Sequence, residues 1–321
     1  MEIVALSLES PPEHIAAWGR LDRLFWADEL CGLEPPSPAE SRMELQPGIA
    51  ARPVGLLAVD NGEVVGGYVG SESLLEDTDT ASGWLVVDRD HRRQGVATAL
   101  LAAADRTHRS NGRKRLESSI RVASAASTFC ANAGATVTQI ELCNVLDINR
   151  LPEDFEELAA PAPGYHLRSW IGDCPADLVT AYAAAHAAMN DVPRGTAVRD
   201  DMTWGVERVR DAEQRQRTYG IVAVTTAAVT DDGDVAGYTD IVITGRPTTV
   251  IQEDTGVARA HRGHGLGLAL KVTNLQQAMA MMRELRTVVT WNAETNQHML
   301  AVNERLGFRP HSRWEEVELD L

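Results

Sequence analysis

A chain of 321 residues has room for two domains of ordinary size, and its 44% hydrophobic content is typical of a packed globular protein. Its 30 Lys and Arg residues against 46 Asp and Glu residues give a net charge of −16, which argues against a nucleic-acid-binding protein and against binding to anionic membranes. The same charge is compatible with cationic or amine-bearing small substrates, or with a role in solubility alone.

The cysteines and the apolar segments bear on where the protein works. The four cysteines are scattered, without a CxxC pair or metal-like spacing, which predicts reduced thiols. No basic segment followed by an apolar one opens the chain, and no apolar stretch approaches the ~18 residues that cross a bilayer. We therefore expect a cytoplasmic protein without membrane contact, as a monomer or a homodimer.

In the first half of the chain, an extended run at 84–88 precedes the segment His91-Arg-Arg-Gln-Gly95-Val-Ala97-Thr-Ala-Leu100 and a long apolar helix pattern. A strand pattern follows at 116–120. Upstream, Asp60-Asn-Gly-Glu63 has the residues of a tight hairpin turn. This half therefore predicts hairpin-linked strands followed by a strand–helix–strand unit.

Residues 151–164 are acidic and carry three of the 14 prolines, which predicts a linker. It would separate an N-terminal domain at 1–150 from a C-terminal domain at 165–321. The two parts share a motif at an offset of 170 residues, with these identical pairs: His91/His261, Arg92/Arg262, Gly95/Gly265, Ala99/Ala269 and Leu100/Leu270. The shared motif in a shared order of elements predicts one domain used twice.

The second half gives the element order of one unit. Its patterns predict a strand at 165–172, helices at 175–189 and 200–217, strands at 220–229, 235–244 and 248–258, a helix at 265–283, a strand at 287–292, a helix at 295–306 and a strand at 312–320. Three hairpin-linked strands followed by strand–helix–strand units indicate an α/β fold (α+β mixed sheet) covered by helices.

The segment Arg262-Gly-His-Gly-Leu-Gly267 lies at a predicted strand-to-helix junction. Glycines let backbone approach a ligand, and the N–H groups at a helix start favour anions, so the turn suits a phosphate or pyrophosphate. It matches neither the dinucleotide fingerprint nor the P-loop, and a glycine-rich turn without a ligand is the alternative. His261-x-x-His264 has no third ligand at a suitable spacing, so we expect no metal.

This segment resembles the acetyl-CoA motif of the GNAT N-acetyltransferase superfamily: Arg-x-x-Gly-x-Gly/Ala, with Val five residues before the Arg. Both halves match it, with Val257, Arg262, Gly265 and Gly267 in the second and Val87, Arg92, Gly95 and Ala97 in the first. The run from Asn296 to Gly307-Phe308 is similar to a second GNAT segment, of which the first half keeps only Gly134-Ala135. The resemblance implies two tandem GNAT-like domains, similar to the arrangement in mycothiol synthases, with a degenerate N-terminal one.

The resemblance also implies a cosubstrate, acetyl-CoA or another acyl-CoA, and the residues that hold it. These are Val257, Arg262, Gly263, His264, Gly265, Leu266, Gly267, Asn292 and Asn296 in the second half, and Val87, Arg92, Arg93, Gln94, Gly95, Val96 and Ala97 in the first. Asn296 could instead serve at the start of its helix. Whether the first half binds coenzyme A is open.

Acetylation of an amine needs a base, because an ammonium group has no lone pair. Glu253 lies on the strand before the motif, where some GNAT members carry a catalytic carboxylate. Strand alternation predicts that it faces away from Gln252 and Asp254, and partial burial would raise its pKa. A solvent carboxylate is the alternative. The first half has Ala81-Ser-Gly83 at this place, so we expect the chemistry in the second half.

Two further positions bear on the reaction. Many GNAT enzymes have a Tyr where this chain has Asn303, so the group that protonates the leaving thiolate is open; water, Tyr219 or Tyr238 are candidates. Acceptor binding is assigned by the resemblance to Asn190, Asp191 and Glu207, although Asn190-Asp191 could merely end a helix. The resulting expectation is acyl transfer from acyl-CoA to a small-molecule amine; a non-catalytic acyl-CoA sensor or interaction module is the alternative.

Overall fold

The computed structural model describes all 321 residues, which divide into two compact units. Unit 1 comprises residues 1–139 and 314–321, and unit 2 comprises residues 140–313. Two strands cross this division, since β6 (Thr136–Asp147) runs from unit 1 into unit 2 and β12 (Arg309–Asp320) runs back. Each unit therefore completes its sheet with a strand segment from the other half of the chain, unlike the contiguous halves that the linker suggested.

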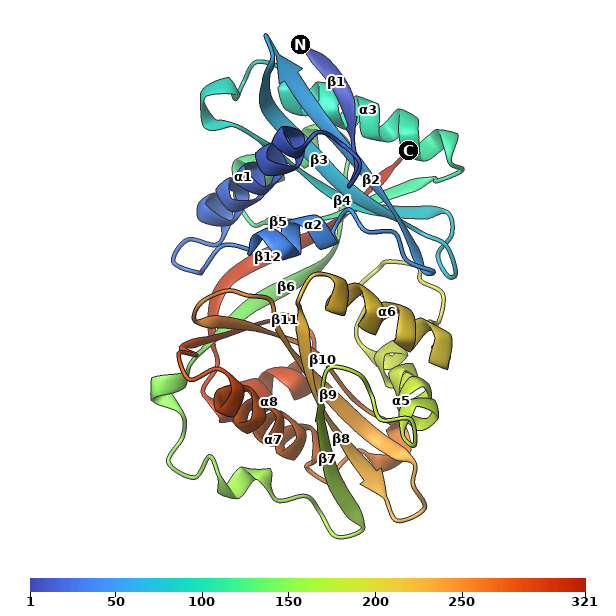
Figure 1. Cartoon of the computed structure of the whole chain (residues 1–321), viewed down its shortest axis with the longest axis vertical. Helices are drawn as coiled ribbons and strands as arrows, with labels where there is room; N and C mark the ends of the chain where they lie inside the picture. Colours follow the sequence, from blue (N-terminus) through green and yellow to red (C-terminus); the bar gives the residue numbers. More distant parts are fainter. The chain divides into compact units, whose positions relative to one another are not determined.

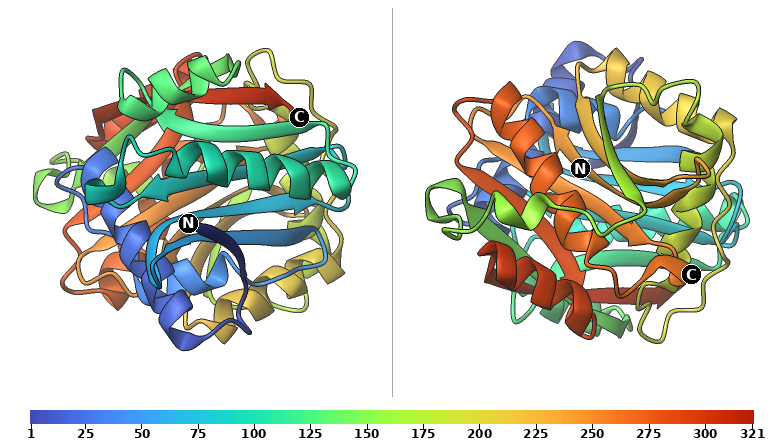
Figure 2. Two further views of the ribbon diagram at one scale, coloured as in Figure 1. Left: turned by 90° about the horizontal axis from the view of Figure 1, so that it is seen from above. Right: turned by 90° about the horizontal axis from the view of Figure 1, so that it is seen from below.

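Unit 1 is a mixed sheet with helices on both faces. Its strands follow the order β1-β2-β3-β4-β5-β12, antiparallel except for the β4–β5 pair. The elements are β1 (Glu2–Leu6), α1 (Pro12–Glu29), α2 (Pro38–Met43), β2 (Ala51–Asp60), β3 (Glu63–Ser73), β4 (Thr80–Val87), α3 (Val96–Ser110), β5 (Arg115–Arg121) and α4 (Ala125–Asn132). Helix α3 packs Leu100 and Ala104 on one face of the sheet, where Figure 2 shows it covering the strands, and α1 packs Trp18 and Leu21 in a separate core.

Unit 2 repeats this plan with the order β6-β11-β10-β9-β8-β7, antiparallel except for the β10–β11 pair. The elements are β7 (Tyr165–Ile171), α5 (Val179–Ala185), α6 (Val206–Thr218), β8 (Val222–Thr230), β9 (Val235–Ile243), β10 (Thr249–Val257), α7 (Leu266–Met281), β11 (Thr287–Ala293) and α8 (Gln297–Leu306). Helices α5 and α6 lie on one side of its strands and α7 and α8 on the other (Figure 1). The α/β mixed sheet predicted from the sequence is confirmed in both units.

The two units differ in the strand pair that precedes the glycine motif. In unit 1, β3 and β4 pair without interruption from Gly66↔Val87 to Glu72↔Ala81. In unit 2, the β9–β10 register shifts between Gln252 and Thr255, which leaves two residues of β10 opposite one residue of β9. This is a β-bulge, and such bulges redirect side chains.

Two of the sequence predictions differ from the structure of unit 2. The helix predicted at 175–189 is shorter, because α5 passes into a 3₁₀ turn at His186–Asp191, and α6 begins at Val206 instead of residue 200. The predicted linker is not a free tether: Phe155 is buried in the core that α7 shares with β10 and β11. Its apolar side chains anchor the segment to unit 2.

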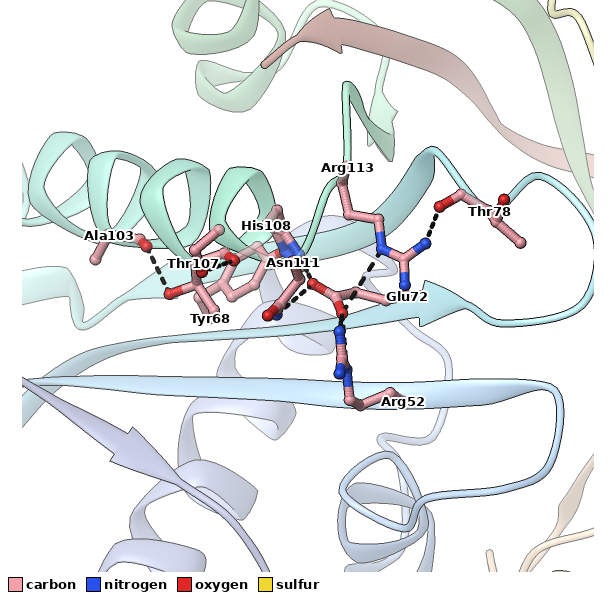
Figure 3. A network of polar contacts seen from close by, with 10 residues as sticks. Arg52, Tyr68, Glu72, Thr78, Ala103, Thr107, His108, Asn111 and Arg113 are labelled. Carbon is pink, nitrogen blue, oxygen red and sulfur yellow. Dashed lines mark hydrogen bonds and ion pairs between the residues drawn. The ribbon is translucent and has the colours of Figure 1, made fainter.

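Unit 1 holds a buried polar network at the end of β3 (Figure 3). The Glu72 carboxylate accepts hydrogen bonds from Arg52, Asn111 and His108, at 2.9 Å from Arg52 Nε and 2.8 Å from His108 Nδ1. Since a carboxylate only accepts, His108 carries its proton on Nδ1, and Nε2 accepts from the Tyr68 hydroxyl at 2.8 Å. Glu72 and His108 are fully buried.

None of the helices combines the length and the apolar character that a membrane span requires. The four cysteines are free thiols.

Candidate active site

The glycine motif of unit 2 forms the turn that starts α7. Gly263 and Gly265 have φ values of +83° and +72°, which glycine adopts without strain, and Gly265 is the N-cap of the helix. A Cβ atom built on Gly263, Gly265 or Gly267 would meet no other atom within 4 Å. Open space therefore lies over the free N–H groups of the helix start, as a bound pyrophosphate requires.

Unit 1 has the same turn at the start of α3. Arg93 and Gly95 adopt φ values of +64° and +84°, in the places of Gly263 and Gly265. The motif arginine folds back onto the preceding strand in both units: Arg92 Nε donates to Val87 O at 3.1 Å, and Arg262 Nε to Val257 O at 3.0 Å. Arg93 shows that a side chain other than glycine can hold the first left-handed position.

A carboxylate also clamps the motif arginines in both units. Asp191 accepts from Arg259 and from Arg262, each at 2.7 Å, and Asp28 accepts from Arg89 and from Arg92. The pKa of Asp191 is lowered, first by the hydrogen bond from Arg259. Asp191 is thus engaged with two guanidinium groups, which leaves the acceptor role assigned to it without structural support.

Beside the turn, β10 and β11 separate. Their parallel pairing covers only Thr249–Ile251 against Thr287–Val289, so β11 no longer occupies the edge of β10 from Gln252 onward. On β11, Asn292 Oδ1 accepts from Asn303 Nδ2 at 2.6 Å, and Asn303 is buried with no partner for its own Oδ1. Asn296 caps α8, since its side chain accepts from Met299 N.

A cavity of about 190 Å³ lies in unit 2 between β7–β10 and the helices α5 and α6. Its walls carry aromatic and aliphatic side chains, four of its lining residues are carboxylates, and no lysine or arginine lines it. The lining residues are Trp170, Gly172, Tyr182, His186, Trp204, Val209, Ala212, Glu213, Gln216, Ala223, Thr225, Asp240, Val242, Glu253 and Asp254.

The bulge of β10 directs two carboxylates to this cavity. Glu253 and Asp254 both line it, so the prediction that alternation turns Glu253 away from its neighbours is wrong with respect to Asp254. Regular alternation fails because the bulge inserts one extra residue. Glu253 is exposed, so the expected partial burial is wrong as well.

Asp240 and Asp254 are the more perturbed carboxyls of the cavity. Burial, together with the charge of Asp254, raises the pKa of Asp240 to about 7, although Thr225 and Tyr182 hydrogen-bond to it. Burial also raises the pKa of Asp254, which accepts from the Tyr238 hydroxyl at 3.1 Å. Carboxyl groups with perturbed pKa values in a cleft are typical of functional sites. The regular alternation expected for β10 does not predict that Asp254 lines this cavity.

Aromatic side chains support these carboxylates. Tyr238 contacts His186 Nδ1 at 2.8 Å, and His186 stacks on Trp204 with ring centroids 4.1 Å apart. Burial lowers the pKa of His186 to about 4, so the imidazole is neutral at pH 7. His186 and Trp204 carry no motif, and nothing in the sequence alone brings them together with Asp240.

The other predicted acceptor residues lie outside the cavity lining. Asn190 holds a loop in place, because its Oδ1 accepts from Met202 N and its Nδ2 donates to Met202 O, each at 2.9 Å. Glu207 is exposed in the first turn of α6. Tyr219, a candidate proton donor, lies at the end of α6 and also outside the lining.

Unit 1 has no equivalent cavity chemistry. The two units can be aligned by counting back along the strands from the motif valines, Val87 and Val257. The pair Val69 and Trp84 of unit 1 then lies where unit 2 has Asp240 and the bulge. Trp84 packs against Trp18 and Phe25, with ring centroids 4.8 and 4.6 Å apart. An aromatic cluster therefore stands in unit 1 at the place of the carboxylates of unit 2.

Comparisons with protein families match both units. A model described as an acetyltransferase (GNAT) domain matches residues 53–134, and one described as the acetyltransferase (GNAT) family matches residues 191–308. No curated protein matches the sequence.

Solved structures extend the likeness over the whole chain. A tandem GNAT protein from the clavulanic acid biosynthesis pathway, without acetyl-CoA, is 28% identical, with a TM-score of 0.85 over 99% of this chain and 98% of that one. A GCN5-related N-acetyltransferase from Sphaerobacter thermophilus is 20% identical, with a TM-score of 0.67 over 99% and 95%. One from Kribbella flavida is 13% identical, with a TM-score of 0.51 over 80% and 88%; these last two support the fold alone.

Proposed function

Because the chain belongs to the GNAT acetyltransferase family, with two GNAT domains in tandem, we propose that unit 2 transfers an acyl group, such as acetyl, from acyl-CoA to the amine of a small molecule. The observation that carries the proposal is the carboxylate-lined cavity at the bulge of β10, on the strand that leads into the open glycine turn. This arrangement would bring an acceptor amine and a thioester to the same strand.

The glycine turn would hold the coenzyme A pyrophosphate through the N–H groups of residues 263–267, with Arg262 beside it. The edge of β10 beyond Ile251, where β11 no longer pairs with it, would take the pantetheine arm and offer N–H groups to the acyl carbonyl. When bound, the thioester supplies an activated acyl group.

Glu253 would take the proton that frees the amine lone pair. It is exposed, so it can pass that proton to solvent between turnovers, and it lies next to Asp254 in the bulge. The amine nitrogen then forms the new bond to the acyl carbon as the bond from carbon to sulfur breaks. The nitrogen loses its second proton to solvent as the amide forms. No tyrosine stands at position 303, and the buried Asn303 amide is no acid, so the departing thiolate would take its proton from water.

The test is transfer from acetyl-CoA to a panel of primary amines, followed by thiol release and by mass of the product. We expect Glu253→Gln to lower kcat by roughly 100-fold or more, because the general base is lost. The matched control is Glu294→Gln, a carboxylate of unit 2 that is paired with Arg313 and is not in the cavity lining. Equal rates for Glu253→Gln and wild type would remove Glu253 from the mechanism.

Asn303 favours a second candidate, a non-catalytic acyl-CoA sensor, since it stands where many GNAT enzymes have a proton-donating tyrosine. Binding of acetyl-CoA without transfer to any amine of the panel would support the sensor and contradict the enzyme.

A further inference from the structure

The cavity of unit 2 has chemistry that bears on which amine it accepts, an inference that rests on the proposed function. Three of its carboxylates, Asp240, Glu253 and Asp254, gather at the bulge of β10. The fourth, Glu213, is already engaged: its carboxylate accepts from Arg210 at 2.6 Å and from Cys174 N at 2.8 Å. Asp240 and Asp254 therefore offer their negative charge to a ligand at one end of the cavity.

Asp240 is the carboxylate best placed to hold a cation inside. Its two oxygens lie 3.3 and 3.4 Å from the Tyr182 hydroxyl, and Thr225 also hydrogen-bonds to it, so both of these partners are neutral hydroxyls. None of the lining residues is a lysine or an arginine, and His186 is neutral, so no protein cation of the lining compensates Asp240 and Asp254. An ammonium group would supply the missing charge.

Most of the remaining wall is apolar, with Gln216 and Thr225 as its polar exceptions beside Tyr182 and His186. The apolar lining residues come from β7, β8, β9 and α6 and include Trp170, Val209, Ala212, Ala223 and Val242. Trp204 stacks on His186, and the Arg208 guanidinium carbon lies 4.6 Å from the Trp204 ring centroid. A ligand body in this space gains by burying apolar surface, whereas a second ammonium group far from the bulge would find no open carboxylate, since Glu213 is engaged.

His186 gives an independent sign of a ligand. It is 5% exposed and lines the cavity, and its Nε2, across the ring from the atom that contacts Tyr238, has no hydrogen-bond partner. Buried polar atoms are nearly always paired, so an orphan in a cavity wall points to a molecule that the wall is built to meet.

We propose that the acceptor is a primary monoamine on a small apolar body, with its ammonium group on Asp240 and Asp254 and its body against Trp170, Val209 and Ala212. Asp240 binds the acceptor, while Glu253 remains the base. We expect dicationic amines and hydroxylated amino sugars to bind more weakly, because the open carboxylates lie at one end of the cavity and most of the remaining wall is apolar.

The test measures amine binding by calorimetry to the full chain saturated with coenzyme A, so that no transfer is needed. The probes share a primary amine: 2-phenylethylamine, ethanolamine, 1,4-diaminobutane and glucosamine. We expect 2-phenylethylamine to bind at least about 10-fold more tightly than the other three, because only it fills the apolar space.

Two variants locate the amine and the body. Asp240→Asn should weaken 2-phenylethylamine by about 10-fold or more and, in turnover, raise KM with little change in kcat. Asp177→Asn, an exposed carboxylate paired with Arg168, is its control. Ala212→Leu adds volume to the cavity and should weaken 2-phenylethylamine while sparing ethanolamine, whereas Ala184→Leu, on the exposed face of α5, should change neither.

Tighter binding of 1,4-diaminobutane or glucosamine, no binding of any probe, or equal effects of Ala212→Leu on all probes would overturn the inference. These measurements distinguish failure of this inference from failure of the proposed function. Binding with the stated preference but without acyl transfer would contradict the function alone, and transfer confined to polar amines would contradict the inference alone.

Discussion

Glu72 of unit 1 and Asp240 of unit 2 are carboxylates set in opposite surroundings. Burial alone would raise the pKa of Glu72, but hydrogen bonds from Asn111, Arg52 and His108 outweigh it and lower the pKa. Burial also dominates at Asp240, and there the neighbouring Asp254 adds to it, so the pKa rises. One carboxylate is therefore stabilised as an anion by its partners, and the other still lacks a partner of opposite charge.

Glu72→Gln should destabilise the protein strongly. It removes the anion between Arg52 and Arg113, leaves guanidinium groups without compensation, and places an amide against His108 Nδ1. We expect the free energy of unfolding at pH 7 to fall by roughly 3 kcal/mol. Because the folded-state pKa of Glu72 is lowered, this contribution is present above the unfolded pKa and lost as pH falls through the folded one, so the difference should shrink in acid.

Denaturant unfolding at pH 7 and in acid measures this effect. Glu63→Gln, an exposed carboxylate in the β2–β3 hairpin, is the matched control and should change stability by less than about 0.5 kcal/mol. A Glu72 variant as stable as the control would show that the network carries no net stabilisation.

Asp240→Asn should do the reverse. Because its pKa is about 7 in the folded protein against an ordinary value of 3.8, Asp240 binds its proton more tightly in the folded state. It therefore costs stability progressively as pH rises between these values. Replacing it by Asn removes that cost, and the gain in unfolding free energy should be larger at pH 8 than at pH 4 by roughly 2–4 kcal/mol. Denaturant unfolding of both proteins at the two pH values checks this, and a pH-independent difference would contradict it.

The glycine turns allow the two cofactor sites to be tested separately. Gly95→Glu and Gly265→Glu each put bulk and negative charge into the open space at a helix start, where a pyrophosphate would lie. We expect each substitution to abolish coenzyme A binding at its own site, or to weaken it there by at least about 10-fold, and to leave the other site unchanged. Calorimetry measures both affinities. Gly233→Glu has the same backbone strain at an open hairpin position (φ +91°) and is the control.

Either of two results would contradict a proposed coenzyme A site. If Gly95→Glu leaves the stoichiometry unchanged, unit 1 does not bind coenzyme A. Unchanged affinity in Gly265→Glu would refute the placement of the cofactor in unit 2.

The elements of the repeat were predictable and the decisive irregularity was not. Strand alternation and the helix pattern predicted β8–β10 and α7, because apolar periodicity reports the buried face of a regular element. The bulge at Glu253–Asp254 breaks that period, and no glycine or proline marks it. The sequence therefore does not predict that Asp254 faces the same cavity as Glu253. The sequence does not predict that His186, Trp204 and Asp240 line one cavity. A cavity depends on packing between distant segments, and a local sequence pattern carries no information about such packing.

Over the whole chain, duplication was visible in the offset of 170, while the exchange of strands was not. Pairing of β12 with β5 links residues 314–320 to residues 115–121, and β6 pairs with β11 in unit 2. A strand pattern predicts that a segment is extended but not which neighbour it joins, since the pairing is set by long-range contacts. The proline-rich segment 151–164 therefore looked like a boundary although the chain crosses between units elsewhere.

This exchange predicts how fragments should behave. A fragment of residues 1–150 keeps β1–β5 but lacks β12, which exposes the edge of β5 and removes Trp314 and Val317, both buried. An uncovered strand edge with an open core promotes aggregation, so we expect this fragment to be insoluble. In the whole chain Thr138 Oγ1 lies 3.1 Å from Glu316 O, so residues 139 and 314 are close enough for a hairpin turn to join them.

Residues 1–139 joined through Asn-Gly to residues 314–321 should therefore be soluble and unfold cooperatively. The same fragment ending at residue 139 is the control for the strand itself. Circular dichroism and denaturant unfolding of the three fragments make the comparison. If 1–150 folds as well as the joined fragment, β12 is dispensable to unit 1, and the contiguous N-terminal half is a domain in its own right.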